Sequence, residues 1–190
     1  RRLRRDESQP RAVAAGVDMQ LYLGEYNNYR RNKGYDAIQI GVGIHTGSLM
    51  LGTIGAENRL EGTVISDTVN LASRIENLTK VYGSRIAVSE TTVLQLKDHR
   101  KFHFRFLDRV RVKGKTKPVA IYEIFDGDEA AVQELKHRTL EDYSTGVKAY
   151  FARDWDHARE AITKVLRIHP QDKAAQLYEL RLASASQPTD

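Results

Sequence analysis

Two polar side chains in the middle of the sequence have the types and spacing to hold a sugar and a phosphate. Asn70 and Arg74 are four residues apart in the stretch "GTVISDTVNLASRIE" at 62–76. On a helix they would therefore share one face. The amide can hydrogen-bond a sugar, and the planar guanidinium can bind a phosphate through two parallel bonds. The pattern alone leaves a second interpretation open, in which Arg74 is simply solvated on the polar side of an amphipathic helix.

A second candidate for anion binding is a row of alternating basic residues. On an extended segment the members of this row would point the same way, and the turn that they enter contains Gly114, which permits a close approach to a phosphate. A solvated strand face is the plainer interpretation, and nucleic-acid binding is a further one. The row consists of Arg109, Arg111, Lys113, Lys115 and Lys117.

The elements that must position these residues follow from the hydrophobic periodicity. We predict strands at 38–44, 85–90 and 119–125, a return strand after the "HTGS" turn in "LMLGTIG", and a bulged strand from Phe102 with the bulge near Asp108. We predict helices at 10–31, from Ser66 to a stop at Gly83, and after a cap at Ser89, followed by helices alone from 132 to 186. Hairpins and crossovers mixed in this way indicate an α+β fold.

The composition excludes several classes of protein. The chain has 190 residues, 41% of them hydrophobic and 29% charged, a net charge of +5 and no cysteine. Disulfides and thiolate metal sites are therefore excluded, and a cytoplasmic location is expected. No apolar run approaches the roughly 20 residues that cross a bilayer, and the histidines lack metal-ligand spacing. Gly41, Gly43 and Gly47 do not fit a dinucleotide motif; instead they let a backbone or a ligand come close.

Several segments together resemble a known family. The stretch "IGVGIHTGSLMLGTIGAENRLEGTVISDTVNLASRIE" and the later "RVKGKTKPVAIYEI" resemble the second half of a class III adenylate/guanylate cyclase catalytic domain, of the bacterial type with threonine at the base-selecting position. The resemblance implies a partial cyclase domain of ferredoxin-like βαββαβ type. It also implies a reaction, in which the ribose 3′-hydroxyl of a nucleoside triphosphate attacks the α-phosphate, pyrophosphate leaves, and two divalent metals (Mg²⁺ or Mn²⁺) assist.

The resemblance also implies a role for each candidate residue. Asn70 matches the asparagine that orients the ribose, and Arg74 matches the arginine that stabilises charge on the α-phosphoryl oxygens. Lys113 matches the lysine that contacts the triphosphate. Thr63 occupies the base-selecting position, with the backbone of Val64 alongside, and its short hydroxyl favours ATP over GTP.

The resemblance further implies that part of the site lies outside this sequence. In the family both metal-binding aspartates and a second base-selecting lysine precede the position of Ala12, and residues 1–11 cannot supply them. The chain does not begin with Met, so we expect a natural or engineered fragment or a processed product, and because it lacks the metal-binding half of the family's domain we expect it to be inactive alone. We expect a homodimer in the intact protein, and membrane attachment only through regions outside this chain. The alternative is a catalytically silent, cyclase-like interaction module, which upstream sequence without the two aspartates would favour.

The last third of the sequence is predicted to be a separate helical unit. We place the cyclase-like part at 1–126 and the tail at 127–190. The tail resembles a single tetratricopeptide-type hairpin, with Gly146, Trp155, Ala158 and Pro170 near the consensus spacing. One repeat cannot bury its own face, so we expect the tail to pack on the cyclase part or on a second subunit. The candidate contact residues are Tyr150, Ile162 and Leu166.

Overall fold

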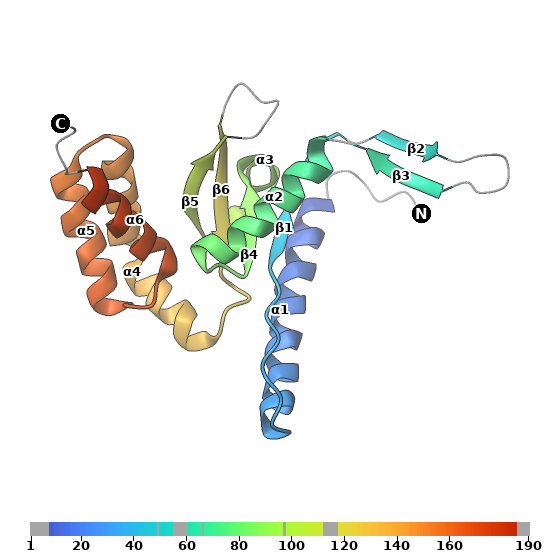
Figure 1. Ribbon diagram of the computed structural model, residues 1–190, viewed down its shortest axis with the longest axis horizontal. Coiled ribbons are helices and arrows are strands. Elements are labelled where there is room, and N and C mark those ends of the chain that lie inside the picture. The colour runs from blue at the N-terminus through green and yellow to red at the C-terminus, as the bar shows by residue number, and fades with distance from the viewer. Residues whose placement is uncertain are drawn as a thin grey trace.

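The computed structural model describes residues 8–48, 50–54, 61–65, 67–96, 98–111 and 118–185, with the backbone alone for the strands at 50–54 and 61–65. A small sheet stands at the centre of the molecule, with helices on both sides of it and a group of three helices at the C-terminal end (Figure 1). This mixed architecture confirms the predicted α+β class.

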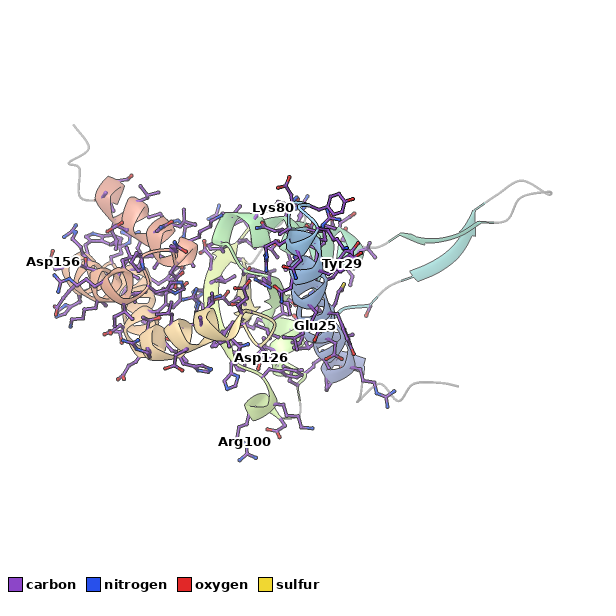
Figure 2. All side chains as sticks on the ribbon, turned by 90° about the horizontal axis from the view of Figure 1, so that it is seen from below. Glu25, Tyr29, Lys80, Arg100, Asp126 and Asp156 are labelled. Atoms are coloured by element: carbon purple, nitrogen blue, oxygen red, sulfur yellow. The ribbon has the colours of Figure 1, made fainter. Side chains whose placement is uncertain are left out.

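The central sheet has four strands in the order β1-β4-β6-β5. β1 (Val42–Ile44) is parallel to β4 (Ile86–Ser89), whereas β6 (Val119–Ile124) is antiparallel to both β4 and β5 (Phe104–Val110). β2 (Met50–Ile54) and β3 (Glu61–Ile65) form a separate two-stranded hairpin. That hairpin extends away from the rest of the molecule (Figure 2). The expected return strand is therefore β2, but it pairs with β3 and not with the strand before it.

The two faces of the central sheet carry different helices. α1 (Ser8–Asn32) and the short α3 (Glu90–Leu94) cover one face, and α2 (Asp67–Tyr82) covers the other together with the C-terminal helices. The alternation of side chains along β4 divides the core in this way, because Ile86 and Val88 point to the α1 side and Ala87 points to the α2 side.

The predicted strand at 38–44 is wrong at its first four residues, since only 42–44 form a ladder. Amide side chains from α1 replace the missing strand partner. Asn27 donates to the carbonyl of Ile38 at 2.8 Å and accepts from its N–H at 2.7 Å, and Gln20 donates to the carbonyl of Ile40 at 3.0 Å. The segment stays extended because side chains satisfy its backbone groups.

Three local predictions are confirmed. Gly83 ends α2 with a φ of 64°, a conformation that favours glycine. The hydroxyl of Ser89 accepts a hydrogen bond from the N–H of Thr92 and so caps α3. The register of β5 against β6 shifts between Phe106 and Asp108, which is the predicted bulge.

The tail consists of α4 (Ala130–Phe151), α5 (Trp155–Ile168) and α6 (Lys173–Ala185). It shares one hydrophobic core with α2 and the sheet, and this confirms the prediction that it packs on the cyclase-like part. Ile162 is fully buried there, and Tyr150 and Leu166 are partly buried against the same core. The division at 126/127 falls between the end of β6 and the start of α4, and it stays a prediction.

Candidate functional site

Asn70 and Arg74 lie on the first two turns of α2 and are both exposed. Neither makes a hydrogen bond or ion pair within the part of the chain that the structure describes. The neighbouring positions Leu71 and Ile75 are almost fully buried. The helix is thus fixed by one face and presents an amide and a guanidinium, one turn apart, on the adjacent face.

The glycines of β1 and the segment before it explain how α2 comes so close to the sheet. A Cβ at Gly43 would lie 2.4 Å from the backbone nitrogen of Glu76 and 2.5 Å from the carbonyl oxygen of Ala72. A Cβ at Gly41 would lie 2.1 Å from the hydroxyl of Thr79. These contacts confirm the steric interpretation of the glycines: Gly43 admits the backbone of α2, and Gly41 admits the Thr79 side chain of the same helix.

Short hydrogen bonds tie the start of α2 to the "HTGS" turn. The hydroxyl of Thr68 donates to the carbonyl of Ser48 at 2.6 Å. On the other side of the turn, His45 Nδ1 and the hydroxyl of Ser89 are 2.7 Å apart, and the hydroxyls of Thr46 and Thr92 are 3.1 Å apart. The turn therefore connects the first turn of α2 to the α3 cap.

For the other three predicted site residues the structure describes the backbone alone or nothing. Thr63 and Val64 lie in β3, where Thr63 pairs with Gly52, but their side chains are outside the described part. Lys113 also lies outside the described residues. Of the basic row, Arg109 is exposed on β5 and its guanidinium lies 5.5 Å from the centre of the Phe151 ring. The described structure thus places two of the five predicted side chains, Asn70 and Arg74, on one helix.

Comparison with known proteins identifies the family of this chain. Residues 3–125 match the profile of the adenylate and guanylate cyclase catalytic domain. This match covers more than half of the chain and includes α2, the hairpin and the whole sheet. The chain belongs to this family.

Individual relatives agree with this assignment. An adenylate cyclase of Anabaena cylindrica is 42% identical over 118 residues, which are 60% of this chain and 24% of the relative. The terminal-differentiation specific adenylate cyclase of Dictyostelium discoideum is 37% identical over 145 residues, 76% of this chain and 7% of the relative. The solved structure of the guanylyl cyclase Cya2 superposes with a TM-score of 0.52 at 36% identity, covering 63% of this chain and 59% of that one. The chain thus spans only a small part of the two curated relatives.

The described residues contain neither a candidate metal site nor a candidate membrane span. They contain no group of three or more His, Asp or Glu side chains placed to hold a metal ion. No helix among them is both long enough and apolar enough to cross a bilayer.

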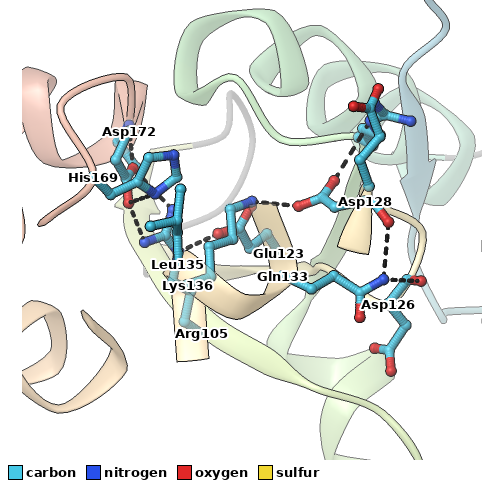
Figure 3. A network of polar contacts seen from close by, with 12 residues as sticks. Arg105, Glu123, Asp126, Asp128, Gln133, Leu135, Lys136, His169 and Asp172 are labelled. Atoms are coloured by element: carbon cyan, nitrogen blue, oxygen red, sulfur yellow. Dashed lines mark hydrogen bonds and ion pairs between the residues drawn. The ribbon is translucent and has the colours of Figure 1, made fainter. Parts of the chain in front are cut away.

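Sequence reasoning missed a buried charge network that joins the cyclase sheet to its tail (Figure 3). Arg105 on β5 binds Glu123 on β6 and binds Asp172 in two places, at 2.6 and 2.9 Å. Lys136 on α4 binds Glu123 at 2.9 Å and Asp128 at 2.7 Å. Asp172 also accepts from two backbone N–H groups at the start of α6.

The charges of this network control the acidity of its members. Burial alone would raise the pKa of Glu123, but the charges of Arg105 and Lys136 outweigh it and lower that pKa. The pKa of Asp172 is also lowered, because the charge and hydrogen bond of Arg105, the N–H of Ala175 and the charge of Lys136 together outweigh burial. A signal was present in the sequence, because Arg105 alternates with Phe104 and Phe106 and must point to the opposite face of the sheet. Charged side chains can be buried on that face because the tail contributes Asp172, which pairs with Arg105, and Lys136, which pairs with Glu123.

A second cluster joins α2, β5 and α6. The hydroxyl of Tyr82, the last residue of α2, donates to Asp108 on β5 at 2.5 Å. Arg181 on α6 lies 2.8 Å from the same carboxylate and 3.3 Å from the Tyr82 oxygen. Burial and the bond to Asp108 raise the pKa of Tyr82 to about 12, so this hydroxyl remains a donor at neutral pH.

Proposed function

We propose that this chain carries the substrate-binding half of an adenylate cyclase site, which converts ATP to 3′,5′-cyclic AMP and pyrophosphate. The observation that carries the proposal is the pair Asn70 and Arg74, exposed and without described partners, on a helix that its buried face fixes. The buried face of α2 fixes the backbone positions from which both donors extend before the substrate arrives, and such preorganisation favours electrostatic stabilisation of a transition state.

In this proposal the two side chains bind different parts of the substrate. Asn70 holds the ribose so that its 3′-oxygen faces the α-phosphorus. Arg74 donates to the α-phosphoryl oxygens, where negative charge increases as the 3′-oxygen attacks and the bond to pyrophosphate breaks. Lys113 contacts the triphosphate, and Thr63 and the Val64 backbone meet the adenine edge. Support for ATP over GTP comes from the Thr63 hydroxyl and from the curated relatives named as adenylate cyclases.

The divalent metals of such a reaction do not fit the residues that the structure describes here, because no acidic cluster is placed to hold one. The family resemblance places the metal-binding aspartates before Ala12, so we propose that they lie in sequence outside this chain, and we derive no step from this chain through the metals. The same reasoning leads us to propose that this chain is inactive alone and that the intact protein works as a homodimer, with the metal ligands of one subunit facing Asn70 and Arg74 of the other.

A series of ligands tests the division of roles. Binding of adenosine, AMP and Mg²⁺–ATP to the 190-residue chain is followed by NMR titration, with the diamagnetic Mg²⁺ as the metal. Arg74→Ala should weaken AMP and ATP by about 10- to 150-fold, as expected for a lost bond to a charged group, and leave adenosine unchanged. Asn70→Ala should weaken all three by about 2- to 12-fold.

Two exposed residues of the same chemical types serve as matched controls. Asn77→Ala removes an exposed amide of α2 that, among the described residues, donates to the carbonyl of Ser73 in its own helix. Arg100→Ala removes an arginine whose side chain is 93% exposed. Both should bind all three ligands as the wild type does. Equal loss of adenosine and ATP in Arg74→Ala would refute the phosphate role, and absence of any nucleotide binding would favour the silent interaction module.

A further inference from the structure

The tail touches each of the five consecutive residues 105–109 of β5, the strand at the free edge of the central sheet. Arg105 binds Asp172, Phe106 and Arg109 pack on the Phe151 ring, the carbonyl of Leu107 accepts from the Tyr178 hydroxyl at 2.7 Å, and Asp108 binds Arg181. Leu107 lies in the bulge, where the ladder with β6 is interrupted. The tail thus covers this edge of the sheet, and the Tyr178 hydroxyl pairs with one of its backbone carbonyls.

The same helices also support α2 from its buried side. Leu71 and Ile75 of α2 belong to one core cluster with Tyr178 and Leu182 of α6. Arg181 lies between these two α6 residues in the sequence and reaches both Tyr82 and Asp108. One side chain of the tail therefore connects the end of α2 to the bulge of β5.

This connection lies on the helix that carries the candidate site. Arg74 and Tyr82 are eight residues apart in α2, two turns of one rigid helix and roughly 12 Å along its axis. Asp108 is only 8% exposed, so loss of Arg181 would leave a buried carboxylate with only the Tyr82 hydroxyl and the N–H of Arg109. The uncompensated charge would favour separation of the two elements that it now joins.

We propose that α6 is a positioning element of the nucleotide site, and that Arg181 is the positioning residue that fixes α2, and with it Asn70 and Arg74, against β5. This inference rests on the proposed function for its consequence in binding. The tail then helps to form the nucleotide site, and a displacement of α6 would change the affinity for nucleotide.

Two measurements on the 190-residue chain test the proposal. The first is amide hydrogen exchange of residues 67–75, which needs no nucleotide. Arg181→Ala should accelerate exchange there and leave α1, on the opposite face of the sheet, unchanged; Arg181→Lys, which keeps the charge, should have a smaller effect. The matched control is Arg159→Ala on α5, whose exposed ion pair with Asp156 lies within its own helix.

The second measurement is a double-mutant cycle on ATP affinity. Arg181→Ala should weaken ATP by about two- to thirtyfold, the usual range for coupling between distant sites. In an Arg74→Ala background the same change should have a clearly smaller effect, because Arg181 acts through the placement of Arg74. If Arg181 only stabilised the fold, Arg181→Ala would lower the melting temperature, and its effect on ATP affinity would multiply with that of Arg74→Ala.

The outcomes separate this inference from the proposed function. If the wild-type chain does not bind ATP, the proposed function fails, and exchange at 67–75 alone decides whether α6 positions α2. If Arg181→Ala leaves exchange at 67–75 as Arg159→Ala leaves it, the inference is wrong. If exchange responds but the two effects on affinity multiply, the proposed role in positioning Arg74 is wrong.

Discussion

The buried Arg105 offers the sharpest test of how the tail is attached. Its side chain is 1% exposed, as are those of Glu123 and Asp172, and its guanidinium also lies 4.2 Å from the centre of the Tyr143 ring. Arg105→Met keeps an unbranched side chain but removes the charge. Among the described residues, Glu123 then retains Lys136 as its charged partner, and Asp172 retains the N–H groups of α6 as its strong partners.

The expected loss follows from that geometry. Removing one partner of a buried ion pair costs about 3–5 kcal/mol, because the remaining charge stays buried without compensation. A domain of this size has roughly 5–15 kcal/mol of stability in total. Arg105→Met should therefore lower the free energy of unfolding by a large fraction, measured by urea titration with circular dichroism. Arg159→Ala, which breaks an exposed pair, should cost less than about 1 kcal/mol.

A companion variant shows whether the uncompensated charge is the cause. Asp172→Asn removes the charge but keeps a good helix cap. In that background Arg105→Met should cost clearly less than it does alone, since less negative charge is left buried. If Arg105→Met costs no more than Arg159→Ala, or if the two changes are additive, the network does not hold the tail as described.

Three further outcomes are expected. Gly43→Ala should destabilise the chain by about 1–3 kcal/mol in urea titration, because its Cβ meets the α2 backbone; an unchanged midpoint would contradict the close packing. Glu123 and Asp172 have folded pKa values below their ordinary 4.5 and 3.8, so the unfolded chain takes up more protons in acid. Stability should therefore fall as pH drops below about 4.5, and Asp172→Asn should flatten that dependence; a steeper one would show the sign to be wrong. Finally, the chain alone with ATP and Mn²⁺ should form no cyclic AMP by chromatography, and measurable product would contradict the proposal that the metal ligands lie outside this chain.

The local parts of the fold follow from the sequence, and the parts that depend on distant partners do not. Periodicity and caps are local, so α2, its stop at Gly83 and the Ser89 cap are predicted correctly. The extended segment before Val42 is not a strand, because Asn27 from α1 occupies the backbone groups that a ladder needs. No short window of sequence contains that competition.

The candidate site also has one part that follows from local sequence and another that depends on distant residues. The spacing of Asn70 and Arg74 predicts a shared, accessible helix face, and the structure confirms it. The charge network is different, because Arg105 is separated from Asp172 by 67 positions. Alternation shows only that Arg105 faces away from the phenylalanines of its strand. The partner of Arg105 on that face comes from the tail. The sequence predicts that the tail packs on the cyclase-like part, but it does not predict which residues meet there.

One affinity measurement tests the central claim, that α2 presents a nucleotide-binding pair. The dissociation constant of Mn²⁺–ATP is compared for the wild type, Arg74→Ala and Arg100→Ala by calorimetry. We predict that ATP binding weakens by about 10- to 150-fold in Arg74→Ala and is unchanged in Arg100→Ala. Equal affinities for all three proteins would contradict the claim.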